Sequence, residues 1–344
     1  MHPYLVEPGL LARVPQLLRE QGFERAVLIT DQDVYRAQFG AFKDGFERLD
    51  VVGIEAGESQ KTLDNAQWMY GCLARLEVDR QTPILVFGGG VIGDLGGFVA
   101  ATYLRGLPLF GIPTSLLAMV DSSIGGKVGV DLPQGKNLVG AFYPPRAVWA
   151  DPEVLSTLPE KEGSNGMAEV IKHGLIASPE LFELCRQLPP FPEWSLEQRT
   201  ELVRRAAQVK LEIVTRDPKE LGERAFLNLG HTLGHALETA GDYTRLSHGQ
   251  AVALGLLAAH ELARRQKLLE KPLPLKETLE RHGLPTRLEK GFEWTRVEAA
   301  LSQDKKRLNG KLRFVLPVRP GLVELVSGVP LEHVREVFEE LCAS

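Results

Sequence analysis

Short β-branched runs alternate with helical patterns through the first 150 residues of the chain. Helical periodicity falls at residues 9–21 and 62–76. The runs that resemble buried strands lie at Arg25–Asp31, Val51–Ile54, Ile84–Phe87 and Leu109–Ile112. Strands that alternate with helices pair in parallel, because each helix carries the chain back to the same edge of the sheet. The sequence therefore predicts an α/β domain whose parallel sheet is covered by helices.

A cluster of prolines near residue 150 marks a change in pattern. Pro144-Pro145 and Asp151-Pro152 interrupt the chain there, and most later segments have helical periodicity. The helical stretches are 166–176, 179–187, 196–215, 231–240, 250–266 and 331–341. The runs between 313 and 327 predict one short hairpin among them. We therefore expect two domains, an α/β domain at 1–150 and a mostly α-helical domain at 151–344.

The composition excludes several classes of protein. The 44% hydrophobic and 25% charged residues are typical of a globular protein, and a net charge of −5 without a basic stripe argues against nucleic-acid binding. The three cysteines form no close pair, so we expect no disulfide framework and a reducing compartment. We see no signal peptide and no apolar run of the roughly 18 residues that a membrane span needs. These features predict a cytoplasmic protein that binds no membrane.

A glycine-rich turn follows the strand at 84–87. Gly88, Gly90 and Gly93 have the spacing of a dinucleotide-binding turn and open a helical pattern. Glycines let the backbone approach a pyrophosphate, and the helix N-terminus offers N–H donors. No acidic residue follows about 20 positions later to bind a ribose, so Asp31, at the end of an earlier strand, is the candidate substitute. The alternative is a tight turn that only packs a helix against a Rossmann-like sheet.

The second half of the chain contains a group of histidines with metal-ligand spacing. His231 and His235 are four residues apart, which places both on one face of a helix, and His248 follows closely. On spacing alone these three would be the ligands, with Glu238 as a competitor. Three protein ligands with one open position are typical of a catalytic zinc or a similar first-row metal. The alternative for each histidine is a hydrogen-bonded structural residue.

Polar residues also gather in glycine-rich loops. Thr114, Ser115 and Asp121 follow the strand at 109–112, and glycines surround Lys127 and Lys136. Binding residues concentrate on such loops, although an isolated lysine is more often a solvated surface residue. Farther along the chain, Lys172 shares a helical face with Glu169, and Arg224 and Asn228 precede His231. Scattered cations of this kind suit a small anionic ligand rather than a polymer.

Several longer motifs together carry a family resemblance. They are GGGVIGDLGGF (88–98), YLRG (103–106), IPTSLLAMVDSSIGGKVGVD (112–131), KNLVGAF (136–142), GMAEVIKHG (166–174), LNLGHTLGHALE (227–238), LSHGQAVALG (246–255) and DKK (304–306). On these motifs the chain resembles the 3-dehydroquinate synthases, a family of sugar-phosphate cyclases. The resemblance implies that Glu169, His231 and His248 hold the metal, zinc or cobalt. It moves His235 from the ligands to the substrate pocket.

The resemblance also implies substrate, NAD and partner contacts. The residues that match substrate contacts are Asp121, Lys127, Asn137, Lys172, Lys210, Arg224 and Asn228, with Lys305 or Lys306 nearby. Arg105 is expected to reach the substrate phosphate of a neighbouring subunit, which implies a homodimer. The residues that match NAD contacts are Asp31, Glu58, Lys61, Gly90, Val91, Asp94, Thr114, Ser115, Asp121, Lys127, Lys136, Thr157 and Leu158.

The reaction that the resemblance implies converts 3-deoxy-D-arabino-heptulosonate 7-phosphate to 3-dehydroquinate and phosphate. A hydroxyl is transiently oxidised by NAD, phosphate is eliminated, the ketone is reduced again, and an aldol step closes the ring. The alternatives are a cyclase that makes 2-deoxy-scyllo-inosose from glucose 6-phosphate and a metal-dependent polyol dehydrogenase that releases NADH. A cation at Lys210 favours a substrate with a carboxylate, and cations suited to phosphate argue against the dehydrogenase.

Overall fold

The chain divides into two compact units. The computed structural model describes residues 3–41, 44–307 and 312–343, without the side chains of 41 and 303–307. The first unit comprises Met1–Pro159 and Ser195–Ala207, and the second comprises Glu160–Trp194 and Gln208–Ser344. The sequence predicted one division near residue 150 and contained no sign that a later segment belongs with the first unit. That segment is the start of α7 (Leu196–Arg216), a helix that begins in one unit and ends in the other.

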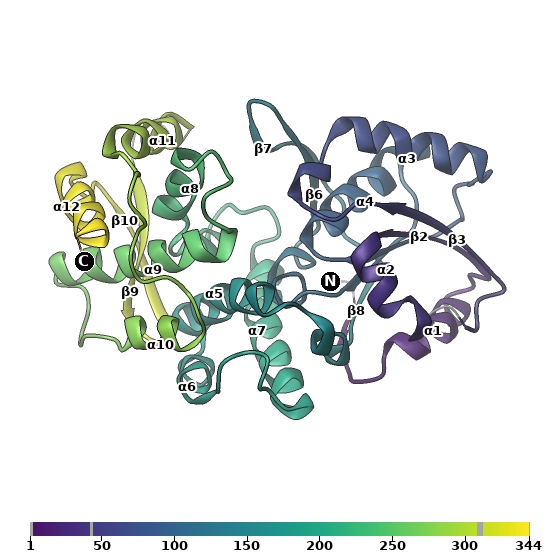
Figure 1. Cartoon of the computed structure of the whole chain (residues 1–344), viewed down its shortest axis with the longest axis horizontal. Helices are drawn as coiled ribbons and strands as arrows, with labels where there is room; N and C mark the ends of the chain where they lie inside the picture. The colour runs from purple at the N-terminus through teal and green to yellow at the C-terminus, as the bar shows by residue number, and fades with distance from the viewer. Residues whose placement is uncertain (1–2, 42–43, 308–311, 344) are drawn as a thin grey trace. The chain divides into compact units, whose positions relative to one another are not determined.

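The first unit is built on a six-stranded sheet in which every adjacent pair is parallel (Figure 1). In spatial order the strands are β1 (Tyr4–Val6), β8 (Ala147–Ala150), β5 (Leu109–Pro113), β4 (Ile84–Gly88), β2 (Arg25–Asp31) and β3 (Arg48–Ile54). The four strands predicted from the sequence are confirmed, and so is the parallel α/β architecture. The sequence did not reveal β1 and β8, which have three and four residues and little pattern.

Helices and short turns connect these strands. The helices of the first unit are α1 (Val14–Glu20), α2 (Gln32–Gln38), α3 (Leu63–Arg75) and α4 (Gly90–Thr102). The short helical turns are η1 (Leu11–Arg13), η2 (Phe39–Ala41), η3 (Glu58–Gln60), η4 (Tyr103–Arg105), η5 (Ala118–Ser122) and η6 (Pro152–Thr157). An antiparallel hairpin of β6 (Lys127–Leu132) and β7 (Gly135–Phe142) completes the unit.

The order of the strands defines where a ligand fits. The chain passes from β2 outward to β3 and then returns to the other side of β2 to form β4. Connections therefore diverge at the gap between β2 and β4, and ligands of open α/β sheets bind outside the carboxyl ends of strands at such a point. Asp31 ends β2 and Gly88 ends β4, so the predicted ribose and pyrophosphate contacts flank this gap.

Helix α4 packs against the sheet at Gly96, three residues after the last glycine of the predicted turn. A Cβ on Gly96 would lie 2.6 Å from Cγ1 of Val86 in β4 and 3.2 Å from Cγ2 of Ile29 in β2. By contrast, a Cβ on Gly93, the third glycine of the predicted turn, would meet nothing within 4 Å. The close helix–strand contact therefore depends on Gly96, while Gly93 faces open space.

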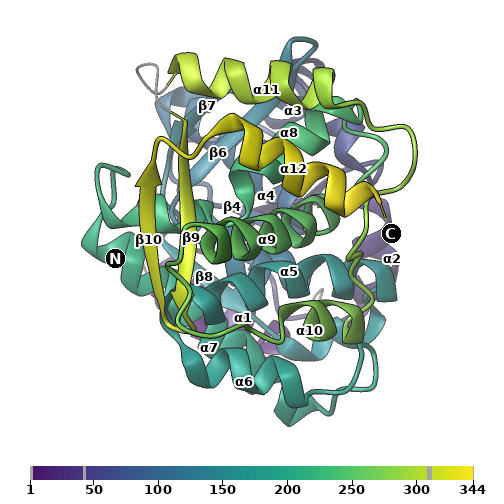
Figure 2. The same ribbon diagram turned by 90° about the vertical axis from the view of Figure 1, so that its left-hand side faces the viewer.

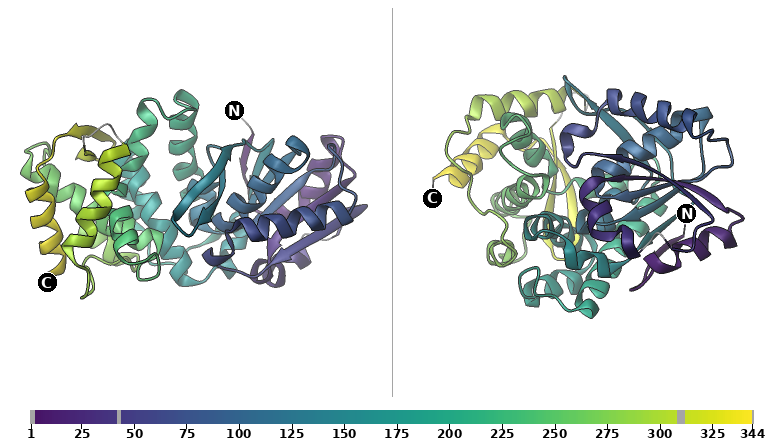
Figure 3. Two further views of the ribbon diagram at one scale, coloured as in Figure 1. Left: turned by 90° about the horizontal axis from the view of Figure 1, so that it is seen from above. Right: turned by 45° about the vertical axis from the view of Figure 1, so that its right-hand side comes forward.

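The second unit is mostly helical (Figure 2). Its helices are α5 (Glu160–Ala177), α6 (Pro179–Gln187), the end of α7, α8 (His231–Ala240), α9 (His248–Arg265), α10 (Leu275–Arg281), α11 (Trp294–Arg307) and α12 (Leu331–Cys342), with the short turn η7 (Glu223–Asn228). The predicted hairpin is confirmed as β9 (Arg313–Arg319) and β10 (Leu322–Ser327), drawn in yellow-green in Figure 3. Among the described residues no helix combines the length and apolarity of a membrane span.

Glycines bring α8 and α9 into backbone contact. A Cβ on Gly255 of α9 would overlap the carbonyl oxygen of Gly230, the N-cap of α8. A Cβ on Gly234 would lie 3.0 Å from the carbonyl oxygen of Ala251. Gly230 also has φ +79°, a left-handed conformation that favours glycine. The close approach of the two helices sets His231, the first residue of α8, near His248, the first residue of α9.

Candidate functional site

Glu169 is a fully buried carboxylate of the second unit. It lies in the middle of α5, and its side chain has no exposed surface. Lys172, one helical turn later, forms an ion pair with it and is itself 1% exposed. Burying a carboxylate is costly unless cations or a metal compensate its charge. A carboxylate at this position is therefore a strong candidate ligand.

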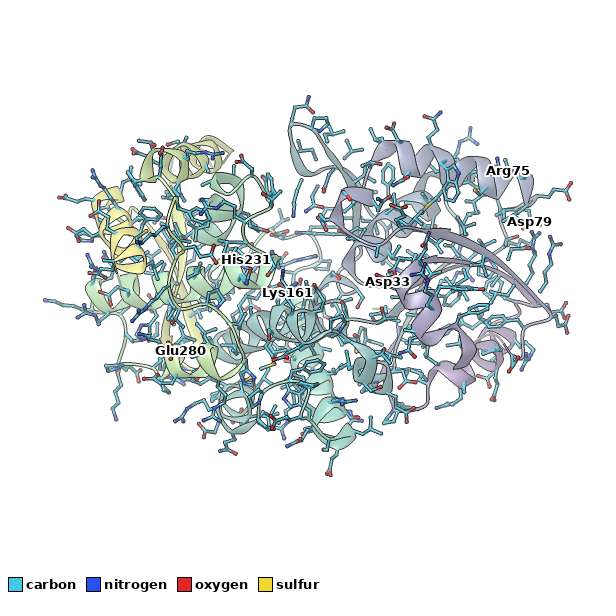
Figure 4. All side chains as sticks on the ribbon, in the orientation of Figure 1. Asp33, Arg75, Asp79, Lys161, His231 and Glu280 are labelled. Atoms are coloured by element: carbon cyan, nitrogen blue, oxygen red, sulfur yellow. The ribbon has the colours of Figure 1, made fainter. Side chains whose placement is uncertain are left out.

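Two imidazoles converge on this carboxylate from other helices. Oε1 of Glu169 lies 3.5 Å from Nε2 of His231 and 3.3 Å from Nε2 of His248. Nδ1 of His231 lies 3.1 Å from the backbone oxygen of Leu229, which leaves Nε2 for another partner. Figure 4 marks His231 at the beginning of α8. Three ligand atoms from α5, α8 and α9 therefore meet at one place within the second unit.

The spacing of these atoms suits a metal ion. The three ligand atoms all lie within 4.8 Å of one another. Ligand atoms about 2.0–2.1 Å from a tetrahedral zinc are separated by about 3.3 Å, close to the two Glu169–imidazole distances above. A carboxylate with two imidazoles is also a donor set that zinc and similar metals accept. The residues Glu169, His231 and His248 therefore fit a divalent first-row metal.

The two imidazoles have opposite electrostatic environments. Burial lowers the pKa of His231 well below its ordinary value, and the positive charge of Lys172 adds to that effect. Burial also lowers the pKa of His248, but the carboxylates of Glu169 and Glu238 outweigh it and raise this pKa to about 10. The surroundings thus favour the protonated form of His248 and the neutral form of His231. A bound cation would take the place of the proton between His248 and Glu169.

His235 occupies a different position from the one that its spacing suggested. It is exposed on α8, and the centre of its ring lies 5.1 Å from that of His231 and 6.3 Å from that of His248. A second possible ligand group joins His235, Glu238 and His248. The geometry supports Glu169 as the third ligand, because its carboxylate approaches the imidazoles of both His231 and His248. His235 remains beside the cluster with its ring accessible.

Buried cations lie on the neighbouring elements of the second unit. Lys172, Lys210 and Arg224 are 1%, 8% and 3% exposed. Arg224 donates from Nη1 to the backbone oxygen of Pro218 at 2.8 Å, and its turn η7 packs against α5. Asn228 ends η7 and is exposed. The side chains of Lys305 and Lys306 lie outside the described residues.

In the first unit, Lys61 is the centre of a polar network. Its Nζ lies 2.6 Å from Oδ2 of Asp94 on α4 and also bonds Oδ1 of Asn137 in β7. The backbone N–H of Asn137 donates to Asp131 at 2.7 Å. Lys61 is 4% exposed, and the nearby carboxylates of Asp94 and Glu58 raise its pKa against the opposing effect of burial. The network holds α4 and the β6–β7 hairpin together beside the glycine-rich turn.

Several other predicted cofactor residues lie in or next to the glycine-rich turn, and two more pair with each other. Gly90 and Val91 begin α4, whose N-cap Gly89 has no side chain to satisfy the first N–H groups. The backbone N–H of Thr114 donates to the carbonyl of Gly88 at 3.0 Å, which fixes the end of β5 beside this turn. Such uncapped N–H groups form an anion-binding position. Lys136 pairs with Glu58 at 3.4 Å, so two more of these residues lie together.

Other predicted residues have structural contacts as well. Asp31 accepts hydrogen bonds from the backbone N–H of Asp33 and Val34 at 3.0 and 2.9 Å, so it caps α2 at the end of β2. Thr157 accepts from Gln38 at 2.6 Å, and Leu158 is the C-cap that follows η6. Ser115 follows β5, and Asp121 lies in η5. Lys127 begins β6 and Arg105 lies in η4, and both are exposed.

Three further contacts support the metal cluster, and one of them had a signal in the sequence. They are the Leu229 carbonyl behind His231, the Glu238 carboxylate behind His248, and the side chain of Asn165, which accepts from the backbone N–H of Gly249. Glu238 alone carried a signal, since it lies seven residues after His231 and therefore on the same face of α8. The other two contacts depend on how α5, α8 and α9 pack.

Comparisons with known proteins agree on one family. Residues 51–165 match the family model described as 3-dehydroquinate synthase N-terminal, and residues 166–307 match 3-dehydroquinate synthase C-terminal. A 3-dehydroquinate synthase of Symbiobacterium thermophilum is 44% identical over 99% of this chain and 98% of its own length. One from Crocosphaera subtropica is 40% identical over 98% of this chain and 95% of its own length.

Solved structures of related cyclases share the fold. A 2-epi-5-epi-valiolone synthase of Streptomyces hygroscopicus, solved with NAD+ and Zn2+, has a TM-score of 0.87 at 28% identity and covers 99% of this chain and 96% of its own. A 2-deoxy-scyllo-inosose synthase, solved with carbaglucose-6-phosphate, NAD+ and Co2+, has a TM-score of 0.87 at 26% identity and covers 98% and 96%. From the two family models and the near full-length relatives, we conclude that the chain belongs to the 3-dehydroquinate synthase family.

Proposed function

We propose that this chain is a 3-dehydroquinate synthase, which converts 3-deoxy-D-arabino-heptulosonate 7-phosphate to 3-dehydroquinate and phosphate. The observation that carries the proposal is the buried Glu169 carboxylate within 3.5 Å of the Nε2 atoms of His231 and His248. This cluster has the donor set of a catalytic metal centre in a chain whose relatives, 40% and 44% identical, are 3-dehydroquinate synthases. The enzyme is thus a phosphate-eliminating lyase of the shikimate pathway.

The proposed cofactors are NAD and a divalent metal, zinc or cobalt. When bound, NAD supplies a hydride acceptor that is regenerated within each turnover, and the metal polarises oxygen atoms of the substrate. We assign the metal to Glu169, His231 and His248. We assign NAD to the border of the glycine-rich turn, where Gly90 and Val91 offer N–H donors and Asp94 forms an ion pair with the buried Lys61.

The protein groups around the metal cluster have distinct proposed roles. The proposed role of His235 is to relay the proton of a substrate hydroxyl, which is supported by its exposed ring lying 5.1 Å from that of His231. The buried cations Lys172, Lys210 and Arg224 would bind the anionic groups of the substrate and stabilise charge on the leaving phosphate. Asn228 would orient the substrate by hydrogen bonding. Asp121, Lys127 and Asn137 keep the substrate role that the family resemblance implies.

Lys210 distinguishes the proposed substrate from that of the nearest rival. The heptulosonate phosphate carries a carboxylate in addition to its phosphate, whereas glucose 6-phosphate, the proposed substrate of a 2-deoxy-scyllo-inosose synthase, carries no carboxylate. Lys210 is a buried cation on α7, and a charge-assisted hydrogen bond to a carboxylate is stronger than one to a neutral hydroxyl. A cation at this position favours the carboxylate-bearing substrate.

We further propose that the enzyme is a homodimer in which Arg105 reaches the substrate phosphate of the partner subunit. Leu104 and Arg105 both have positive φ, 49° and 65°, and both are exposed. The hydroxyl of Tyr143 donates to the backbone oxygen of Leu107 at 2.6 Å and so anchors the chain next to this strained turn. Strained backbone of this kind persists where a function depends on it, and here it presents an arginine at the surface.

Mixed dimers test the role of Arg105. The variants Arg105→Ala and Lys172→Met should each be nearly inactive alone. If Arg105 acts across the interface, a mixed dimer has one complete site, and mixing the two variants should restore a substantial part of the activity. No recovery despite subunit exchange, shown with differently tagged subunits, would contradict the proposal.

A cytoplasmic location remains a prediction that cell fractionation would test.

A direct assay tests the proposed reaction. The purified protein, loaded with zinc or cobalt and given NAD, should release phosphate from the heptulosonate phosphate and form 3-dehydroquinate. Omission of either NAD or metal should abolish the release. Glucose 6-phosphate serves as the matched control, because it offers a phosphate without a carboxylate. Faster phosphate release from glucose 6-phosphate would favour the rival cyclase instead.

A further inference from the structure

His248 lies between two buried carboxylates. Its Nε2 is 3.3 Å from Oε1 of Glu169, and its Nδ1 is 3.6 Å from Oε1 of Glu238. The two nitrogens of an imidazole point away from each other, so one of them can bind a metal while the other contacts the protein. Nε2 of His248 can therefore bind a metal next to Glu169 while Nδ1 contacts Glu238.

Packing alone does not fix the ring of His248. Its side chain is 28% exposed, whereas those of Glu169 and Glu238 are 0% and 7% exposed. The backbone of His248 is well fixed, because Ser247 and Gln250 form a capping box at the start of α9. The capping box does not set the side-chain torsions of His248, so the direction of the ring depends on the polar groups that it meets.

The other imidazole has a backbone anchor. Nδ1 of His231 faces the Leu229 carbonyl at 3.1 Å, which directs Nε2 toward Glu169. Glu238 lies seven residues after His231 on the same face of α8, about 10 Å along the helix axis. This displacement places Glu238 behind His248, where it corresponds to the Leu229 carbonyl behind His231. Each histidine thus has its Nδ1 toward an oxygen acceptor and its Nε2 toward Glu169.

An alternative makes Glu238 a ligand together with His235 and His248. That arrangement would use Nδ1 of His248 and would leave Glu169 outside the centre. The Glu169 arrangement is favoured because its carboxylate approaches two imidazoles at 3.3 and 3.5 Å, close to the ligand separations around a tetrahedral metal. Glu238, in contrast, approaches His248 from the far side of the ring.

We infer that Glu238 is a positioning residue that accepts a hydrogen bond from Nδ1–H of His248 and so holds the ring with Nε2 toward the metal. The inference rests on the metal site proposed above. A carboxylate behind a metal-bound histidine fixes the tautomer and the ring orientation and makes the ligand more basic. The expected consequence is a higher affinity for the metal, with no change in the set of ligands.

The test measures metal binding rather than turnover. Apo protein is titrated with zinc against a chromophoric chelator, and the absorption spectrum is recorded with cobalt. Glu238→Ala should weaken zinc binding about 10- to 100-fold, the usual cost of losing such a contact. Glu238→Gln should lie between Ala and wild type, because its amide oxygen still accepts a hydrogen bond without the charge. Both variants should keep the wild-type cobalt spectrum.

Two further variants calibrate the result. Glu261→Gln removes another partly buried carboxylate of this unit, which bonds only Arg264 and Arg265 in the contacts described for it, and should leave zinc affinity unchanged. Glu169→Ala removes a proposed ligand and should alter the cobalt spectrum. Circular dichroism of each apo protein confirms that the variants are folded, and only folded variants are compared.

Three outcomes would overturn the inference. A cobalt spectrum of Glu238→Ala that changes as that of Glu169→Ala does would make Glu238 a ligand. Zinc affinity within twofold of wild type in Glu238→Ala would leave the residue without a positioning role. Failure of the wild-type protein to bind zinc would remove the metal site itself. Because no substrate is used, an error in the proposed reaction would leave these binding results unaffected.

Discussion

At the scale of single residues, burial points to Glu169 rather than His235 as a metal ligand, whereas spacing does not. His235 has the more obvious relation to His231, since the two are four residues apart, yet it is exposed. Glu169 comes from a distant helix and is completely buried against both imidazoles. Spacing suggested His231, His235 and His248, with Glu238 as a competitor, but it could not select Glu169. The family resemblance suggested Glu169 because its motif, GMAEVIKHG, spans that helix.

Substitutions of the two histidines of α8 should therefore have different effects. His231→Ala removes a proposed ligand and should abolish both metal binding and turnover. His235→Ala should keep about one equivalent of metal but lower kcat about 10²- to 10⁴-fold, the usual contribution of a positioned proton-transfer group. Metal analysis of the purified variants alongside kinetics makes the comparison. Full metal content and activity in His231→Ala would show that the ligand assignment is wrong.

At the scale of elements, regular patterns were predictable and short segments were not. The sequence predicted the strands β2, β3, β4 and β5 of the sheet, the main helices of the second unit and the β9–β10 hairpin. It did not predict the strands β1 and β8 or the β6–β7 hairpin, whose short, glycine-rich or irregular segments have little periodicity. Their pairing is decided by tertiary contacts, which local sequence does not encode.

The glycines of α4 offer a test of element packing. Gly96→Ala would place a Cβ 2.6 Å from Val86, so the helix must shift, and the free energy of unfolding should fall by about 1–3 kcal/mol. Gly93→Ala is the matched control on the same helix, since its Cβ meets nothing within 4 Å. Alanine is the better helix former, so this variant should keep its stability or gain up to about 1 kcal/mol. Chemical denaturation measures both, and equal losses would contradict the packing account.

At the scale of the whole molecule, each of the two units contributes different groups to the proposed chemistry. The first unit contributes a parallel sheet with a glycine-rich turn next to its topological switch point. The second contributes a carboxylate and two imidazoles from three helices. The sequence predicted both kinds of unit but not that the start of α7 joins the first one, because a helical pattern gives no sign of which domain it packs against.

The central claim is that NAD is recycled within each turnover at a metal-dependent site. The most direct measurement counts the phosphate released from the heptulosonate phosphate for each NAD supplied, while absorbance follows NADH. We predict many phosphates per NAD with no accumulation of NADH, and no release from metal-free protein. NADH that accumulates in step with substrate consumption, or phosphate release that is independent of NAD, would contradict the proposed mechanism.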